Sequence, residues 1–276
     1  MIEDPGVTVT VSSPGRGRLD CLDEHAELVR SVVRALGSDL STLDIEVGAP
    51  PLHVGLGTTT QLSLAVGMAL SVLSGSEFDV LRVARLTGRG RRSWIGIAGF
   101  VRGGFVLDKG RLEGEGWAHD FSNLRFPEDW AVLLIRPIGQ RGLSGDVEER
   151  AMRAAERLST HLEDVVRKVI RGIITKDFDE FVDGVELVQE TMGTTFSRAQ
   201  GGRYHSLSEE LVMLLREHGA RGVGQSSWGP TVYGFFRDTK IAESVKVMLS
   251  NVLRHGEHVV HVTGARNRGV DVSFSS

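Results

Sequence analysis

Residues 51–73, PLHVGLGTTTQLSLAVGMALSVL, join a glycine-rich turn directly to a helical pattern. Gly55 and Gly57 permit positive φ and close approach of a ligand. The positive end of a helix dipole and its free N–H groups favour a phosphate or pyrophosphate at such a turn. The apolar residues that predict the helix recur every three or four positions: Leu62, Ala65, Val66, Ala69, Leu70 and Leu73.

The segment before this turn reads as a half-buried strand, because Leu43, Ile45 and Val47 alternate with acidic residues. Strand, glycine loop and helix are the arrangement that an anion site needs. An ordinary tight turn with threonine caps is the alternative, and the spacing is neither that of the Walker loop nor that of the dinucleotide fingerprint. The predicted phosphate or pyrophosphate ligands are Gly55, Leu56, Gly57, Thr58, Thr59 and Thr60.

Two motifs carry a resemblance to the GHMP kinase superfamily. Pro51-x-x-x-Gly55-Leu56-Gly57-Thr58-Thr59-(x)5-Ala65 resembles its second motif, which wraps nucleotide phosphates, and GQSSWGPTVY at 224–233 resembles its third motif in homoserine-kinase-like members. Within the superfamily, the runs HVGLGTTTQLSLAV, GRGRRSWIGIAGFVRGGFVLDKG and GVGQSSWGPTVYGF most resemble β-ribofuranosylaminobenzene 5′-phosphate synthases of methanopterin biosynthesis. The likeness extends from about residue 1 to the last helix.

The resemblance implies an α+β fold of the GHMP-kinase-like two-layer type. Residues 1–145 would form a phosphate-binding half like the second domain of ribosomal protein S5, and residues 146–276 a ferredoxin-like half. The alternation at 7–12 predicts a strand almost at the first residue, whereas the superfamily places another strand and loop before it. We therefore expect that the chain starts about thirty residues late, and that one strand is missing from a sheet edge.

Composition excludes several classes of protein. At 276 residues, 41% hydrophobic and 25% charged, the chain is an ordinary globular one. A net charge of −4 argues against a nucleic-acid binder. Cys21 is the single cysteine of the sequence and cannot form an internal disulfide, which fits a reducing cytoplasm. Without a run of about 18 apolar residues or a signal peptide, the sequence predicts a soluble cytoplasmic protein with no membrane partner.

Periodicity and turn signals predict the remaining elements. Residues 113–128 read as loop and hairpin without assignable chemistry. Helices are expected over 23–36, 78–86, 147–158, 161–175, 178–192, 206–218 and 241–253, and strands over 105–107, 130–137, 220–225, 231–236, 259–263 and 270–274.

The run GRGRRSW at 88–94 places three arginines among glycines. A solvated charge cluster is one interpretation. The superfamily has its active-site wall here, and arginine binds phosphate or carboxylate through two parallel hydrogen bonds, so we expect a ligand role for at least one arginine. The predicted substrate-binding residues are Arg89, Arg91, Arg92 and Ser93, then Arg141 after strand 130–137, where a plain connector is the alternative, and Gln225, Ser226, Ser227 and Gly229 of the third motif.

One departure from the superfamily bears on the reaction. GHMP kinases carry an Asp eight or nine residues before the paired glycines, and it helps to deprotonate the acceptor hydroxyl. Here Trp94 and Ile95 occupy those positions before Gly103 and Gly104, and no carboxylate lies between Asp79 and Asp108. The resemblance to the synthase fits this absence, since its reaction transfers nothing to a hydroxyl.

The implied reaction condenses 4-aminobenzoate or 4-hydroxybenzoate with phosphoribosyl pyrophosphate and yields an aryl ribotide, CO₂ and pyrophosphate. The resemblance also implies a homodimer and Mg²⁺ carried on the substrate phosphates, which is how this ion usually binds. The sequence identifies no catalytic residue and no metal ligand. Two alternatives stay open: an ATP-dependent small-molecule kinase, which would share both glycine motifs, and a non-catalytic protein that binds a phosphorylated metabolite.

Overall fold

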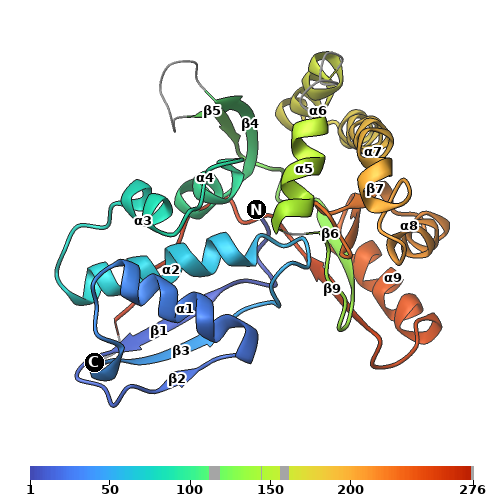
Figure 1. Cartoon of the computed structure of the whole chain (residues 1–276). Coiled ribbons are helices and arrows are strands. Elements are labelled where there is room, and N and C mark those ends of the chain that lie inside the picture. The colour runs from blue at the N-terminus through green and yellow to red at the C-terminus, as the bar shows by residue number, and fades with distance from the viewer. Residues whose placement is uncertain (112–118, 144, 156–161, 275–276) are drawn as a thin grey trace.

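The computed structural model describes residues 1–111, 119–143, 145–155 and 162–274 (Figure 1). Both helices and sheets are present, so the predicted α+β class is confirmed. None of the described helices is long and apolar enough to cross a membrane. The elements of the first half are β1 (Thr8–Ser12), β2 (Leu19–Asp20), α1 (Asp23–Ala35), η1 (Leu40–Thr42), β3 (Asp44–Gly48), α2 (Thr58–Leu73), α3 (Val80–Leu86), α4 (Ile95–Arg102), β4 (Phe105–Arg111) and β5 (His119–Leu124).

The first sheet has the order β1-β3-β2, with β1 antiparallel and β2 parallel to β3. Helices α1 and α2 cover one face of it (Figure 1). Ile45 and Val47 of β3 point into the core, as their alternation predicted. Among the described residues β1 pairs on one side only. A strand missing from this edge therefore stays a prediction.

Helix α4 was not predicted, because Gly96 and Gly99 belong to a stretch over 88–104 that is rich in glycine. In the structure these glycines allow close packing. A β-carbon at Gly96 would lie 2.8 Å from Cγ2 of Thr60, and one at Gly99 would overlap the Met1 side chain. Ile97 and Phe100 of the same helix pack with buried residues of α2 and α3.

The second half is built on an antiparallel sheet of order β7-β8-β6-β9. Alternate residues of β8 enter two different cores: Val232 and Phe236 pack with α8 and α9, while Tyr233 and Phe235 pack with α6 and α7. The elements are β6 (Ala131–Pro137), α5 (Gly145–Ala155), α6 (Glu163–Thr175), α7 (Phe178–Gln200), α8 (Ser208–Glu217), β7 (Arg221–Gln225), β8 (Val232–Phe236), α9 (Thr239–Val252) and β9 (His258–Thr263).

Strand β6 precedes residue 146 and nevertheless lies inside the second sheet, between β8 and β9. The division into residues 1–145 and 146–276 remains a prediction. Helix α7 runs beyond the predicted end at residue 192 and stops where Gly201 adopts the left-handed conformation. Residues 113–118, 156–158 and 161 of the predicted loop and helices lie outside the described residues.

The strand predicted over 270–274 does not form, and this prediction was wrong. The backbone N–H of Val270 donates to the Phe100 carbonyl at 2.8 Å. A β-carbon at Gly269 would overlap the Val101 carbonyl. The segment therefore binds the C-terminal turn of α4, where carbonyl groups lack helical partners, instead of a sheet edge.

Candidate functional site

The first glycine motif forms the N-terminus of α2. Gly55 and Gly57 have φ of 87° and 69°, a region that residues with a β-carbon rarely adopt. Gly57 is the N-cap, and no acidic residue lies in the first turn of the helix. The positive end of the helix dipole is therefore not neutralised from within that turn, which suits an anionic ligand.

The third motif contacts this loop directly. The hydroxyl of Ser226 donates to the Gly55 carbonyl at 2.7 Å. A β-carbon at Gly55 would overlap the Ser226 carbonyl oxygen, so only glycine fits. Ser227 and Gly229 both have positive φ, 54° and 68°. Two segments 171 residues apart in sequence are thus in direct contact.

The side chain of Gln225 holds the third motif in place from the protein interior. Gln225 is only 6% exposed. Its Oε1 accepts from the His205 backbone N–H at 2.6 Å, and its Nε2 donates to the Ser227 carbonyl at 3.0 Å. Both ends of the amide therefore hold the loop in shape.

A third loop, which follows β6, completes the junction. The backbone N–H of Gly142 donates to the His53 carbonyl at 2.8 Å, and a β-carbon at Gly142 would overlap the Gly229 carbonyl. Arg141 Nη2 lies 2.8 Å from Oε2 of Glu24, and that same oxygen accepts from the Leu52 backbone N–H at 3.3 Å. Arg141 thus lies beside the phosphate loop, paired with a carboxylate of α1.

The head of α4 adjoins the same helix terminus. Gln61 Nε2 donates to the Gly96 carbonyl at 2.7 Å. Trp94 and Ile95, the residues at the position of the kinase carboxylate, are the N-cap and first residue of α4. The structure therefore places the departure from the kinase pattern next to the predicted phosphate loop.

The three arginines have different environments. Arg92 is exposed and its Nη1 lies 2.6 Å from Oε2 of Glu148 in α5. Arg91 is also exposed. Arg89 is partly buried and donates from Nε to the Thr87 carbonyl at 3.1 Å. Burial, followed by the positive charges of Arg92 and Arg91, lowers the pKa of Arg89. An anion would relieve this repulsion, which makes Arg89 the strongest anion-binding candidate of the three.

The sequence interpretation missed a buried pair, Asp108 of β4 and His119 of β5. Nδ1 of His119 lies 2.9 Å from Oδ1 of Asp108, and the two side chains are 2% and 8% exposed. Oδ2 of Asp108 accepts from the Trp94 backbone N–H at 2.7 Å. Burial opposes ionisation of Asp108, but hydrogen bonds from His119, the backbone and Ser93 together lower its pKa. A carboxylate from β4 thus contacts the head of α4.

No sequence motif identifies this pair, because Asp108 and His119 come together only when β4 pairs with β5. Ser93, a predicted ligand, is also engaged in this corner, where its Oγ accepts from the Ile95 backbone N–H at 3.2 Å. The ring of His119 stacks on Trp94 with centroids 5.7 Å apart and planes at 15°.

Three buried polar atoms near these motifs have no hydrogen-bond partner among the described residues: Thr58 Oγ1, Thr231 Oγ1 and His119 Nε2. Leaving such an atom unsatisfied costs about 1–3 kcal/mol. Two of the three belong to the glycine motifs, and the third belongs to the pair beside α4. Such groups are kept where a ligand can use them.

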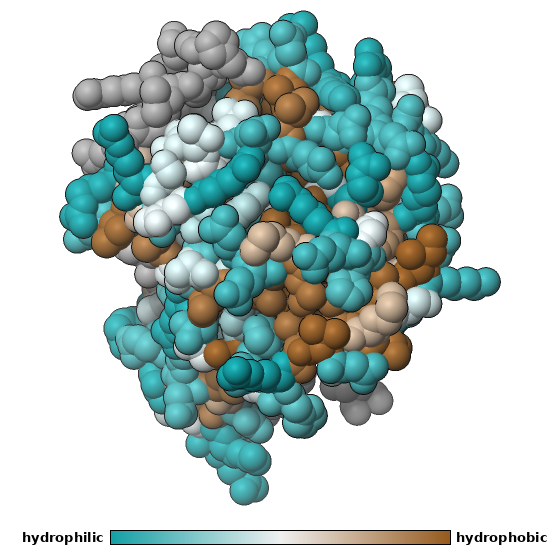
Figure 2. All heavy atoms as spheres, turned by 90° about the vertical axis from the view of Figure 1, so that its right-hand side faces the viewer, coloured by the Kyte–Doolittle hydropathy of each residue, from teal (hydrophilic) through white to brown (hydrophobic). Residues whose placement is uncertain are grey.

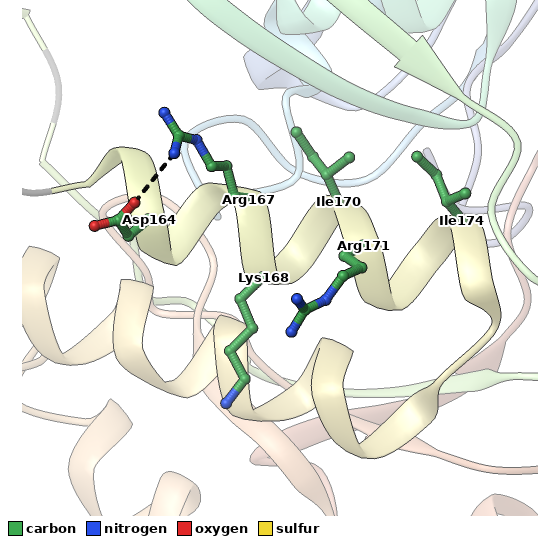
Figure 3. Close-up of a pocket in the computed structure, with 6 residues that line it drawn as sticks. All are labelled: Asp164, Arg167, Lys168, Ile170, Arg171 and Ile174. Carbon is green, nitrogen blue, oxygen red and sulfur yellow. Dashed lines mark hydrogen bonds and ion pairs between the residues drawn. The ribbon is translucent and has the colours of Figure 1, made fainter.

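A hollow of about 650 Å³ along α6 is a less suitable candidate. Figure 3 shows Lys168 and Arg171 on one side of the helix and Ile170 and Ile174 on the other, so its side chains do not converge. Lys168 pairs with Asp183, and Arg171 pairs with Glu180.

Apolar surface is exposed on the side of α8 and α9, as Figure 2 shows. Helix α9 alone leaves four large apolar side chains at least 47% exposed: Ile241, Val247, Met248 and Val252. Exposed apolar surface of this kind marks interaction faces more often than catalytic sites.

Comparisons with known proteins agree with the motifs. Residues 149–255 match the family model "GHMP kinases C terminal". A β-ribofuranosylphenol 5′-phosphate synthase of Methanothermobacter thermautotrophicus is 30% identical over 97% of this chain and 84% of its own length. The corresponding protein of Archaeoglobus fulgidus is 34% identical over 80% of this chain and 72% of its own length.

Solved kinase structures share the fold. Leishmania major mevalonate kinase, solved in complex with R-mevalonate, superposes with a TM-score of 0.66 at 14% identity, covering 96% of this chain and 87% of its own. Homoserine kinase of Cytophaga hutchinsonii gives 0.59 at 16% identity, covering 97% and 89%. The predicted GHMP-kinase-like fold is confirmed by this similarity.

Proposed function

The chain belongs to the β-ribofuranosylphenol 5′-phosphate synthase family, and from that premise we propose that it condenses a 4-substituted benzoate with phosphoribosyl pyrophosphate. The products are the aryl ribotide 5′-phosphate, CO₂ and pyrophosphate. The name of the relatives describes a ribofuranosylphenol product, which favours 4-hydroxybenzoate over 4-aminobenzoate as the aromatic substrate.

The contact between the two glycine motifs carries this proposal. Gly55 and Ser226 bring backbone groups of both halves to the N-terminus of α2. A diphosphate group carries enough negative charge and acceptor atoms to use such a surface. Kinases of the same fold would use it for ATP, but here Trp94 and Ile95 stand where those enzymes need a carboxylate.

In the proposed mechanism the protein binds the departing pyrophosphate and holds the benzoate ring against the sugar. Bond breaking leaves positive charge on the sugar carbon, and the ring carbon that bears the carboxylate attacks it before CO₂ departs. The first turn of α2 and Arg89 stabilise the charge that develops on pyrophosphate. Holding the two substrates in contact supplies much of the remaining rate acceleration.

Mg²⁺ fits this site as an ion carried on the substrate. The described residues contain no group of three or more His, Cys, Asp or Glu side chains that could hold a metal. Glu24, hydrogen-bonded to the Leu52 backbone at the loop, is the carboxylate that would reach such an ion. When bound, Mg²⁺ neutralises charge on the leaving pyrophosphate.

We extend the proposal to a homodimer in the cytoplasm. The free thiol of Cys21 is consistent with such a reducing compartment. Two protomers would bury exposed apolar side chains of the kind that α9 presents. Sedimentation equilibrium measures the mass directly, and a monomer at micromolar concentration contradicts the homodimer.

Carboxyl-labelled 4-hydroxybenzoate with phosphoribosyl pyrophosphate and Mg²⁺ tests the function. We expect release of labelled CO₂ and of pyrophosphate in equal amounts. Label that stays in the benzoate contradicts the proposal.

Two further assays separate the alternatives. The kinase alternative predicts transfer of labelled phosphate from ATP to homoserine or mevalonate, and we expect none. A non-catalytic binding protein would bind its ligand without turnover. Thermal unfolding with Mg²⁺ and either ATP or phosphoribosyl pyrophosphate identifies the preferred ligand, because selective binding raises the unfolding temperature.

A further inference from the structure

In the pair Asp108 and His119, a carboxylate holds an imidazole by one of its two ring nitrogens. An ionised carboxylate can only accept hydrogen bonds, so Nδ1 of His119 donates to Asp108 across the 2.9 Å contact. In the neutral form of the imidazole, Nε2 then carries the lone pair. This atom is buried and has no hydrogen-bond partner among the described residues.

The pair is joined to the phosphate loop by consecutive contacts. His119 stacks on Trp94, whose ring centroid lies 6.2 Å from that of Phe121. Trp94 caps α4, and α4 is tied to α2 through Gln61. Aromatic faces of this kind suit a flat benzoate ring.

We propose that His119 is the general base that removes the proton from the 4-hydroxyl group of 4-hydroxybenzoate, and that Asp108 positions its imidazole. The inference rests on the proposed function. The hydroxyl is para to the ring carbon that attacks the sugar. Ionising it sends electron density to that carbon and makes it a stronger nucleophile.

The proposed reaction needs no reactant other than the two substrates. Nε2 of His119 accepts the hydroxyl proton while the ring carbon bonds to the sugar carbon, and the bond from the sugar to pyrophosphate breaks with its electron pair on pyrophosphate. The bond to CO₂ then breaks, and its electrons restore the aromatic ring and return charge to the phenolic oxygen. The imidazolium gives the proton back to that oxygen.

Among the described residues, Asp108 is the charged group that contacts the imidazole of His119. The other nearby charges are engaged elsewhere. On the same hairpin Asp120 pairs with Lys109 at 3.1 Å. Arg102 of α4 lies 5.7 Å from the ring centroid of Phe121. Asp108 therefore stabilises the imidazolium that forms when the proton is taken.

Two variant substrates separate this role from a structural one. The amino group of 4-aminobenzoate donates its lone pair without losing a proton, so it needs no base. The phenol of 3,5-difluoro-4-hydroxybenzoate is acidic enough to be ionised in neutral solution. His119→Gln should therefore damage turnover of 4-hydroxybenzoate selectively.

The experiment measures kcat for CO₂ release with each benzoate, phosphoribosyl pyrophosphate and Mg²⁺. For His119→Gln we expect a loss of about 100-fold or more with 4-hydroxybenzoate, the usual contribution of a general base, and a loss of under about threefold with the other two substrates. Asp108→Asn should show the same selectivity with a smaller loss. Phe121→Leu, which alters the aromatic wall but carries no proton, should affect all three substrates equally.

Each outcome decides the inference. Equal losses with all substrates, or no loss with 4-hydroxybenzoate, overturn the base role and leave the synthase function standing. If the parent does not use 4-aminobenzoate, the fluorinated phenol carries the comparison. A parent that decarboxylates no benzoate overturns the proposed function, and the inference with it. Circular dichroism and thermal unfolding identify a variant that does not fold, and His119→Asn then replaces it.

Discussion

The junction of the glycine loops and the corner formed by Trp94, Asp108 and His119 both adjoin the N-terminal part of α2 but are built differently. At the junction, the Ser226 hydroxyl holds the Gly55 carbonyl beside the N-terminus of α2, where the first backbone N–H groups of a helix have no helical partner. At the corner, Asp108 and His119 supply side chains from two strands of a hairpin. Substitutions that change the backbone shape should therefore damage the junction most. Substitutions that change the ionisable groups should damage the corner most.

This difference fits the two halves of the proposed reaction. Binding pyrophosphate requires many donors directed at one charged group, and backbone N–H groups provide them without a titrating side chain. Moving a proton requires a group whose charge changes, as an imidazole does near neutral pH. The carboxylate at the head of α4 is Asp108 of β4.

The largest effect is expected from Gly55→Val. Its φ of 87° strains a β-branched residue, and the added side chain would overlap the Ser226 carbonyl. The two motifs would have to move apart, and displacement of about 1 Å at an active site can cost 100-fold in rate. We expect a loss of at least about 100-fold in kcat/KM for phosphoribosyl pyrophosphate, measured by pyrophosphate release.

Gly75→Val is the control for backbone strain alone. Gly75 has φ of 67°, lies past the end of α2 and has nothing within 4 Å of its added β-carbon. Gly75→Val should cost about 1–2 kcal/mol of stability and leave kcat/KM unchanged. Gly57→Val tests the loop itself. Its added β-carbon has nothing within 4 Å, so the protein should stay folded, while the new side chain fills the space in which the ligand would bind and should abolish binding. Retained binding in Gly57→Val removes this loop from the site.

The junction could be predicted from sequence because its geometry depends on residue type. Only glycine fits at Gly55, so the motif itself encodes the contact, although its partner Ser226 was recognised only through the superfamily resemblance. The corner could not be predicted, since Asp108 and His119 meet through the register of β4 and β5, with an irregularity between Asp108 and Arg111. Helix α4 was missed for a related reason, because glycines that serve close packing resemble glycines that make turns.

The next largest effect is expected from variants in the arginine run at 88–94. They test whether side chains, in addition to the glycine loops, contribute to binding of phosphoribosyl pyrophosphate. Arg89 is partly buried beside like charges, while Arg92 pairs with Glu148 on the surface. We expect Arg89→Ala to weaken binding of phosphoribosyl pyrophosphate by roughly 2–5 kcal/mol. Because Arg92 is 39% exposed and screened by solvent, Arg92→Ala should change binding by at most about 1 kcal/mol.

Titration calorimetry with Mg²⁺ and phosphoribosyl pyrophosphate measures both variants, with Arg91→Ala beside them. Arg89→Lys is the matched control, since it keeps the charge and loses the paired donors of the guanidinium. Parental affinity in all three alanine variants shows that the run is a solvated surface cluster.

The stabilising role of Asp108 is tested by the pH dependence of protein stability. A folded-state pKa below the ordinary value means that ionised Asp108 stabilises the fold. That contribution is complete above the ordinary Asp pKa of about 3.9 and is lost as the pH falls through the folded pKa. Asp108→Asn should therefore lower the free energy of unfolding by about 1–3 kcal/mol at pH 7, and this difference should shrink below about pH 4.

Urea unfolding at a series of pH values gives this difference directly. Asp120→Asn removes only the exposed ion pair with Lys109, so its stability should follow that of the parent throughout. A difference for Asp108→Asn that stays constant down to pH 3 contradicts the stabilising role of the carboxylate.

The smallest effect is expected at the ion pair between Arg141 and Glu24, which borders the junction without forming it. Arg141 is 58% exposed, so Arg141→Ala should cost at most about 1 kcal/mol of stability and little affinity. Glu24 is 20% exposed and also accepts from the Leu52 backbone, so Glu24→Gln, which keeps an acceptor, should preserve the loop. If Glu24 also reaches Mg²⁺, Glu24→Gln will raise the Mg²⁺ concentration needed for half-maximal pyrophosphate release, while Arg141→Ala will not. Equal Mg²⁺ requirements in both variants and the parent would restrict Glu24 to holding the loop, and the junction would then act through its backbone alone.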